Sequence, residues 1–558
     1  MLLGQFHSQH FGLLNSHMPK IIVLDNIAQE GLDLLEQADN IEYVVQTGLQ
    51  GDALKAALLD ADGAICRSGV TLSEDVLAGN TRLKVIVRAG VGTDNIDKPA
   101  ATRQGIIVMN TPTGNTSSTA EHAMTLMLAL SRNVAPAFQS LREGRWDRKA
   151  YMGSQLSGKT LGVVGLGRIG QEVAKRAQAF QMKIVGFDPF LTAEQAAKLG
   201  VELCETVDEM LPKIDYLTVH TPLTPQTKGL ISQAQLQLLK PGARLINCAR
   251  GGIYDEAALA DGLDQGILAG VALDVFETEP CTDSPLFQKE GVICTPHLGA
   301  STEEAQTQVA VEAVELAIDY LTTGAVRHAV NVAAIDPKTL ESLAGYLELA
   351  YRMGIFLDQW DEGGVQAVQV EYRGHVANED TKLLTASLCA GLLKEALEDS
   401  VNIVNSQVLL KDRGIEIAET HSSEMGAFAS SMTVNLTTDK GTYTAGGTVF
   451  GNKMPRLIRL DDMRLESYLD GNILIFVHDD LPGIIGHMGS TLGTYQINIA
   501  QMSVGRPIDA QPGGEAIGVL NLDSIPTKEV TSALASQNGI TSVKSIELPN
   551  AGEKPPWI

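Results

Sequence analysis

Three side chains in the middle of the chain have the types and the order needed to oxidise an alcohol next to a carboxylate. Arg250 stands in NCARGG, Glu279 in DVFETEP and His297 in TPHLGAST, each after an apolar run typical of a strand. Histidine is the side-chain type whose ordinary pKa lies nearest neutral pH, so His297 is the candidate to exchange a proton with a hydroxyl group. Glu279 can bond the other ring nitrogen and favour the protonated ring, while the guanidinium of Arg250 matches the fork of a carboxylate. This set predicts acid–base chemistry on a 2-hydroxy acid.

A glycine-rich loop upstream predicts the electron acceptor. Gly165, Gly167 and Gly170 form GLGRIG between an apolar run at 160–164 and a helical stretch. In such a loop the first glycine allows a tight turn, the second lets the backbone approach a pyrophosphate, and the third lets the helix pack on the strand. Asp188 follows at the end of the next strand, where a carboxylate bonds a ribose 2′-hydroxyl and repels a 2′-phosphate. The pattern therefore predicts NAD rather than NADP.

The elements around these residues alternate between strands and helices. Compact apolar runs at 21–25, 63–67, 84–89 and 106–110 predict buried parallel strands, and a second alternation runs from 160 to 297. We expect a long helix at 117–132, and another at 303–324 that returns the chain to the first set of strands. The fold class is therefore α/β, with two doubly wound Rossmann-like domains and a cleft between them.

The last two hundred residues differ in pattern. Residues 335–470 mix helical stretches with alternating strands, which predicts an α+β domain. From Asn472 the order strand–helix–strand–strand–helix–strand is typical of a ferredoxin-like module.

The composition narrows the class of function. A net charge of -25 disfavours binding to nucleic acid or to an anionic membrane, so an anionic substrate needs a locally basic site. Six cysteines without CxxC spacing predict no disulfide framework and no metal site, and indicate a reducing compartment. No apolar run approaches the ~18 residues that span a bilayer, and residues 1–17 lack Lys and Arg. We expect a cytoplasmic protein.

Taken together, the motifs resemble the D-2-hydroxyacid dehydrogenase family in its long form. Besides those above, the resemblance rests on RSGVTL (67–72), VRAGVGTDNID (87–97), NTPTGNTSSTAEH (110–122), GRWDRKAYMG (144–153) and HTPLTPQT (220–227). It implies Arg250, Glu279 and His297 as catalytic residues, with His297 as proton donor. It also implies cofactor contacts at Arg168, Ile169, Asp188, Thr221, Cys248, Ala249, Asp274, Gly299 and Ala300, beside the three glycines, Arg250 and His297.

The resemblance further implies the substrate D-3-phosphoglycerate, oxidised to 3-phosphohydroxypyruvate at the first step of L-serine synthesis. Arg67, Ser68 and Arg88 match positions that hold its phosphate and carboxylate, together with Arg250. Arg148 matches one that reaches across the interface of a homo-oligomer, either a dimer or a tetramer.

Residues 472–502 resemble an ACT domain, a small-molecule sensing module. His478, Asp480 and Asn498 match polar residues that bind a serine effector in regulated family members; the alternative is a purely structural dimerisation surface. The expected division is a leader at 1–18, a substrate-binding domain at 19–116 plus 302–330, an NAD-binding domain at 117–301, an intervening domain at 331–470, an ACT domain at 471–549 and a tail at 550–558.

Two other functions compete with this interpretation. One is a reductase of glyoxylate, hydroxypyruvate or another 2-oxo acid on the same fold, although an unphosphorylated acid needs neither the arginine pair nor a serine sensor. The other is a non-enzymatic NAD-sensing regulator, which the complete Arg/Glu/His set disfavours.

Overall fold

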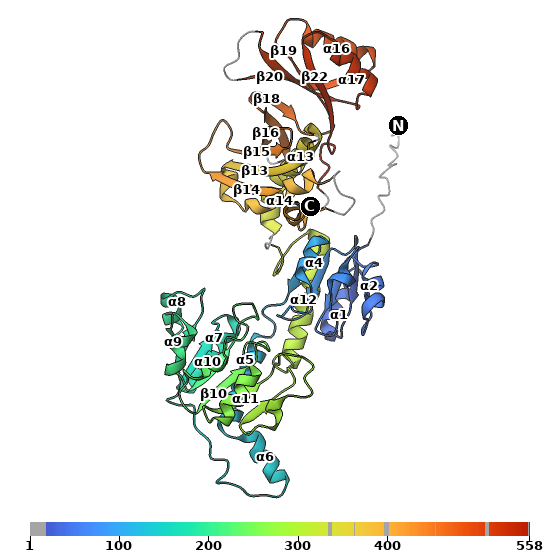
Figure 1. The fold of residues 1–558 in the computed structure, drawn as a ribbon. Coiled ribbons are helices and arrows are strands. Elements are labelled where there is room, and N and C mark those ends of the chain that lie inside the picture. The colour runs from blue at the N-terminus through green and yellow to red at the C-terminus, as the bar shows by residue number, and fades with distance from the viewer. Residues whose placement is uncertain are drawn as a thin grey trace, which may run out of the picture.

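A computed structural model describes residues 18–332, 337–361, 363–394, 401–451, 453–507, 513–555 and 557. Two parallel sheets form one half of the molecule and a ten-stranded sheet forms the other (Figure 1). The predicted α/β class with a following α+β region and a ferredoxin-like module is confirmed. The predicted leader, except its last residue, lies outside the described residues.

The first sheet is parallel, with strand order β2-β1-β3-β4-β5. Its strands are short, and all except β2 are deeply buried because apolar clusters cover both faces. The elements are β1 (Lys20–Val23), α1 (Gln29–Glu36), β2 (Glu42–Val45), α2 (Gly51–Leu58), β3 (Gly63–Cys66), α3 (Glu74–Leu77), β4 (Val85–Arg88), α4 (Lys98–Arg103) and β5 (Ile107–Asn110). Strand β2 was not predicted; its side chains are half-buried or exposed, so it lacks a compact apolar run.

The second sheet is also parallel, with strand order β12-β11-β10-β9-β6-β7-β8. The order reverses between β6 and β9, which is the switch point where doubly wound folds bind dinucleotides. The strands are β6 (Thr160–Val164), β7 (Lys183–Phe187), β8 (Glu202–Leu203), β9 (Tyr216–Val219), β10 (Ala243–Asn247), β11 (Leu268–Leu273) and β12 (Val292–Cys294). The helices are α7 (Arg168–Ala179), α8 (Ala193–Lys198), α9 (Val207–Met210), α10 (Gln233–Leu236) and α11 (Glu256–Asp264), with short 3-10 turns at Leu211–Lys213 and Pro285–Gln288.

Two long helices join these sheets. Helix α5 (Thr116–Ser131) takes the chain from the first sheet to the second, and α12 (Glu303–Thr323) brings it back to pack on α1. Thr302 caps α12 by accepting a hydrogen bond from the Ala305 amide at 3.2 Å, and Gly324 ends it at a φ of 74°. After α5, helix α6 (Val134–Arg142) stands on a segment that projects from the second sheet (Figure 1).

The C-terminal half is built on one continuous sheet, with strand order β14-β13-β15-β16-β17-β18-β20-β21-β19-β22. We expected two separate modules here, but β18 pairs with β20 through Met463–Pro507 and Arg464–Arg506 and so joins them. The first part holds α13 (Pro337–Trp360), β13 (Val365–Gly374), a 3-10 turn at His375–Asn378, α14 (Thr381–Leu392), α15 (Ser406–Asp412), β14 (Glu416–Ser422), β15 (Ser430–Thr438), β16 (Thr442–Phe450), β17 (Met454–Leu460) and β18 (Met463–Tyr468). The second holds β19 (Asn472–Asp479), α16 (Ile484–Thr494), β20 (Ile499–Pro507), β21 (Glu515–Leu522), α17 (Lys528–Ala535) and β22 (Ile540–Glu547) in ferredoxin-like order.

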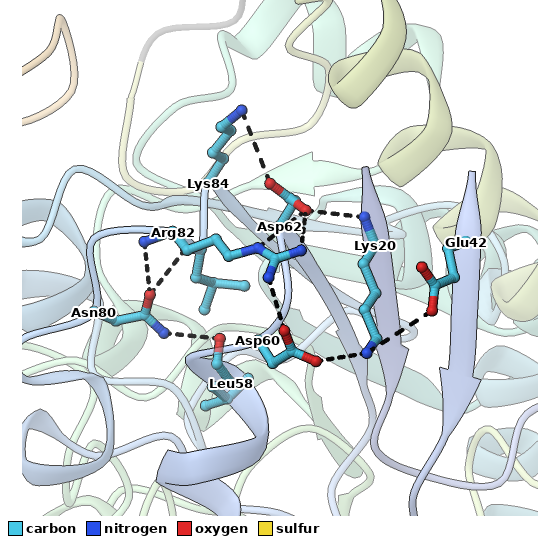
Figure 2. A network of polar contacts seen from close by, with 9 residues as sticks. Lys20, Glu42, Leu58, Asp60, Asp62, Asn80, Arg82 and Lys84 are labelled. Carbon is cyan, nitrogen blue, oxygen red and sulfur yellow. Dashed lines mark hydrogen bonds and ion pairs between the residues drawn. The ribbon is translucent and has the colours of Figure 1, made fainter. Parts of the chain in front are cut away.

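A network of paired charged side chains lies at the amino ends of the strands of the first sheet. Figure 2 shows the buried carboxylate of Asp62 between Lys20, Arg82 and Lys84. Asp62 accepts hydrogen bonds from the Lys20 amide at 2.9 Å and from Nη2 of Arg82 at 3.2 Å, while Nη1 of Arg82 reaches Asp60 at 2.8 Å. These charges pair with one another at the end of the sheet opposite to Arg67 and Arg88, so they stabilise the fold and are not available to a ligand.

Among the described residues, no helix has the length and the apolar character that a membrane span requires.

Candidate active site

The glycine-rich loop lies between β6 and α7, at the switch point of the second sheet. Gly165 has a φ of 86°, and a Cβ there would lie 2.7 Å from the carbonyl oxygen of His220. A Cβ on Gly170 would lie 2.0 Å from the carbonyl oxygen of Gly165, so helix and loop touch. A Cβ on Gly167, in contrast, would meet no protein atom within 4 Å. Gly165 and Gly170 therefore serve the close packing of the loop, whereas Gly167 leaves backbone open towards the space where a pyrophosphate would bind.

Asp188 follows β7 and lies against the same loop. Its carboxylate accepts hydrogen bonds from the amide of Leu166 at 2.8 Å and of Phe190 at 2.9 Å. The hydroxyl of Thr221, after β9, is buried and has no hydrogen-bond partner among the described residues. An unpartnered hydroxyl beside an open backbone fits a bound dinucleotide.

The remaining predicted cofactor residues lie along the same edge of the sheet. Arg168 and Ile169 begin α7, whereas Cys248 and Ala249 follow β10, and Asp274 follows β11. Gly299 and Ala300 lie in the segment between β12 and α12. The carboxyl ends of parallel strands thus bring together residues from 165 to 300, and the donor set present fits NAD.

Glu279 and His297 form a directly bonded pair. Oε2 of Glu279 lies 2.7 Å from Nδ1 of His297, and Oε1 accepts a hydrogen bond from the Phe276 amide at 3.0 Å. Burial alone would raise the pKa of Glu279, but the bonds from His297 and Phe276 hold it below its usual range. The carboxylate is therefore ionised at neutral pH, and Nε2 of His297 is the ring nitrogen left for a substrate.

Arg250 enters the site from the turn after β10. Its Nε donates to Asp94 at 2.8 Å and its Nη1 to the carbonyl of Ala249 at 2.6 Å. A Cβ on Gly92 would lie 1.7 Å from Nη2 of Arg250, so only glycine lets the guanidinium lie there. The charge of Arg250 also lowers the pKa of Glu279, which places the arginine beside the Glu–His pair.

Arg67 and Arg88 lie at the carboxyl ends of β3 and β4, and Arg88 is close enough to Arg250 for their charges to interact. Burial lowers the pKa of Arg88, and the nearby charges of Arg67 and Arg250 lower it further. The Nε atoms of Arg67 and Arg88 are buried and have no hydrogen-bond partner among the described residues. Arg67 and Ala28 also line a hollow of about 680 Å³ at the start of α12. Ser68, next to Arg67, is exposed.

Arg148 is not part of this cluster. It is exposed on the segment after α6, which projects away from the second sheet (Figure 1).

The three residues expected to bind an effector are not brought together within one chain. His478 lies near the carboxyl end of β19 and Asp480 just beyond it, where Asp480 pairs with Nε of Arg506 at 2.9 Å. Asn498 precedes β20, whose first residue is level with the first residue of β19. Asn498 therefore lies roughly 20 Å away, at the other end of the sheet, where it donates to Asp523 at 2.9 Å.

Two residues of the site were not singled out from the sequence. Asp94 holds Arg250, and His122 on α5 contacts Asp274, 3.1 Å from its Oδ1. Both stand inside motifs that carry the resemblance, but a single Asp or His has no spacing that indicates its partner.

The fold and the site define an NAD-dependent dehydrogenase of 2-hydroxy acids. The family model for the NAD-binding domain of D-isomer specific 2-hydroxyacid dehydrogenases matches residues 124–299. The D-3-phosphoglycerate dehydrogenase intervening domain matches 342–461, and the ACT domain, a module that typically binds small-molecule effectors, matches 472–539. The chain belongs to the D-3-phosphoglycerate dehydrogenase family and is an NAD-dependent oxidoreductase.

Full-length relatives support this assignment. D-3-phosphoglycerate dehydrogenases of Methanocaldococcus jannaschii and Bacillus subtilis are each 41% identical, over 531 and 532 residues; each match covers 95% of this chain and 100% of the relative. Among solved structures, a glyoxylate reductase from Paecilomyes thermophila is 27% identical with a TM-score of 0.51, covering 56% of this chain and 98% of that one.

Proposed function

We propose that the protein oxidises D-3-phosphoglycerate to 3-phosphohydroxypyruvate with NAD, as the first step of L-serine synthesis. The observation that carries the proposal is the convergence of Arg67, Arg88 and Arg250 beside the Glu279–His297 pair. Neighbouring positive charges repel one another, and an anion bound among them offsets that repulsion. A substrate with a phosphate and a carboxylate supplies that anion, and the relatives' names agree with it.

Each residue has a distinct task in the proposed reaction. Nε2 of His297 accepts the proton of the C2 hydroxyl, and the ionised Glu279 stabilises the imidazolium that forms. Arg250 binds the carboxylate and the C2 oxygen, which fixes the orientation of the reacting carbon. Arg67 and Arg88 hold the phosphate end. Bound NAD supplies the acceptor for the hydride that leaves C2.

The test compares NADH formation from D-3-phosphoglycerate and from D-glycerate. We expect rapid turnover of the phosphorylated acid only, and Arg67→Gln should raise KM for it without a matching fall in kcat. Arg103→Gln, which removes an exposed ion pair of the same domain, is the matched control and should change neither constant. Equal or better turnover of D-glycerate would show a general 2-hydroxyacid dehydrogenase or 2-oxo acid reductase instead.

We also propose that the protein is a homo-oligomer whose contact includes the projecting segment around α6. Phe138 is 61% exposed there, Trp146 76% and Met152 83%, so apolar side chains gather on one protruding element. Arg148 on the same segment would then reach the active site of a neighbouring subunit. Light scattering of Phe138→Asp should show a smaller particle than wild type; an unchanged mass would place the contact elsewhere.

For regulation, we propose that L-serine binds the ACT domain between two chains. His478 and Asp480 lie at one end of its sheet and Asn498 at the other, so a site with all three needs a second copy. The test is a titration with millimolar L-serine, read as activity and as melting temperature, on wild type and Asn498→Ala. If serine changes neither the activity nor the melting temperature of the wild type, the ACT domain is a purely structural surface.

We place the enzyme in the cytoplasm, which the six unpaired cysteines of the described chain support.

A further inference from the structure

We propose that His122 is a positioning residue that fixes, through the carboxylate of Asp274, the turn that carries His297. The inference rests on the dehydrogenase activity proposed above. It assigns a task to the crossover helix α5, which carries His122 from the first domain into the second.

The carboxylate of Asp274 is the centre of the turn at 295–299. The residue is fully buried, and its own carbonyl accepts a hydrogen bond from the amide of His297 at 2.9 Å. The carboxylate accepts hydrogen bonds from Oγ1 of Thr295 at 2.6 Å and from the amides of Leu298 at 2.7 Å and Gly299 at 2.8 Å. The residues before and after His297 are therefore bonded to one side chain.

His122 completes this set from the side of the helix. Its Nε2 lies 3.1 Å from Oδ1 of Asp274 and 3.1 Å from Oγ1 of Thr295. Burial opposes the charge of Asp274, but bonds from His122 and Thr295 hold its pKa below the usual range. An ionised carboxylate only accepts hydrogen bonds, so Nε2 of His122 carries the proton and donates it. A buried charge left without such a donor would be costly.

The backbone of His297 needs this support. Its φ is 54°, in the left-handed region that side chains with a Cβ rarely adopt. Such a conformation costs about 1–3 kcal/mol and persists only where the surrounding contacts hold it. The hydrogen bonds to Asp274 on both sides of His297 supply that restraint, and they keep Nδ1 in reach of Glu279.

Helix α5 contacts the turn at a second point. Oγ1 of Thr119, one helical turn before His122, donates to the carbonyl of Gly299 at 3.3 Å. A Cβ on Gly299 would lie 3.2 Å from Oδ2 of Asp274 and 3.4 Å from Thr119, so helix, carboxylate and turn are in close contact. The helix that joins the two domains thus holds the loop of the proton acceptor.

The experiment compares three variants in the full-length protein. His122→Leu removes the donor, and His122→Gln keeps an N–H near the position of Nε2. Ser131→Ala is the matched control, because Ser131 also lies on α5 and its buried hydroxyl, 2.9 Å from that of Tyr216, touches no part of the turn. Each variant is measured for kcat, KM, melting temperature and, without cofactor, amide hydrogen exchange of the segment 295–300.

We expect His122→Leu to lower kcat by about 10- to 100-fold, because the proton acceptor is displaced, with little change of KM for D-3-phosphoglycerate. Exchange at 295–300 should become faster in the cofactor-free protein, and His122→Gln should restore most of both quantities. Ser131→Ala should lower the melting temperature alone. If His122→Leu fails to fold, His122→Asn, which is polar but too short to reach Asp274, provides the same readings.

An unchanged kcat together with unchanged amide exchange at 295–300 in His122→Leu would overturn the proposal. So would a loss of activity that Ser131→Ala reproduces at the same loss of melting temperature. Lack of activity of the wild type on D-3-phosphoglycerate would instead overturn the proposed function, and the exchange data would still decide the role of His122.

Discussion

At the scale of single residues, the balance between burial and hydrogen bonding sets different protonation states around the active site. Glu279 and Asp274 are ionised because hydrogen bonds outweigh the cost of their burial. His220, whose Nδ1 is buried without a partner, lacks such compensation, and burial lowers its pKa to about 4. A negative charge therefore lies beside His297, whereas the ring of His220, the residue before Thr221, is neutral.

The state of His220 predicts acid sensitivity of the fold. In the unfolded chain this ring takes up a proton below its ordinary pKa of 6.5, whereas the folded protein resists until about 4. The native state therefore loses stability as the pH falls from about 6.5 to 4, by an amount on the order of 3 kcal/mol from this group. The pKa values of Glu279 and Asp274 are lowered in the folded protein, so their contributions to stability are lost only at still lower pH.

Thermal unfolding of His220→Gln at pH 7 and at pH 4.5 checks this prediction. We expect a smaller drop of melting temperature between the two values than in wild type, because the uncharged amide takes up no proton. His375→Gln, which replaces an exposed histidine, should leave the drop unchanged. An identical drop in wild type and His220→Gln would contradict the prediction.

At the scale of elements, different glycines of the loop between β6 and α7 serve helix packing and ligand binding. Gly170 lies where the helix touches the turn, and Gly167 lies where the backbone is open. Glycine is therefore required at these two positions for different reasons, and only the tertiary structure distinguishes them.

Alanine at Gly170 and alanine at Gly167 should have different effects on melting temperature and on NADH binding. Gly170→Ala places a Cβ against the Gly165 carbonyl, so α7 must shift; we expect a lower melting temperature and weaker NADH binding. Gly167→Ala should keep the melting temperature, since its Cβ meets no protein atom, yet weaken NADH binding by blocking the pyrophosphate. NADH fluorescence titration and thermal unfolding measure both. Wild-type NADH affinity in Gly167→Ala would show that the pyrophosphate does not lie there.

At the scale of the whole molecule, a buried arginine holds the C-terminal half together. Arg352 on α13 pairs with Glu348 at 2.7 Å and donates to the carbonyls of Asn550 at 2.8 Å and Glu553 at 2.9 Å. The ring of Trp557 packs edge-on against Tyr351, with 5.0 Å between centroids. Residues 550–557 are thus attached to α13 of the intervening region.

Arg352→Gln should release this attachment. Removing the buried cation leaves the largely buried Glu348 and several carbonyls unpaired, which we expect to cost about 3–5 kcal/mol. Limited proteolysis should then cleave the tail faster, and the melting temperature of the C-terminal half should fall. Arg373→Gln, which removes an exposed pair with Glu371, is the control and should have little effect. Unchanged cleavage in Arg352→Gln would show that the tail is held by other contacts.

Much of this molecule could be predicted from local patterns. The strands at 63–66, 85–88 and 107–110 lie within their predicted runs, because buried parallel strands are compact and apolar. Helix α12 (Glu303–Thr323) lies within the helical stretch predicted at 303–324. The half-exposed strand β2 was missed because its residues carry no such pattern.

The sequence by itself determined the fold class, and it predicted the glycine loop, Asp188 and the Arg250, Glu279 and His297 set, since each depends on residue type and on spacing along a few neighbours. Only the tertiary structure decided that Asp94 holds Arg250, that His122 supports the turn of His297, and that Asn498 lies far from His478. It also decided that β18 and β20 join two modules into one sheet. These contacts link residues tens to more than a hundred positions apart, and such pairing is set by how whole elements pack rather than by any local pattern.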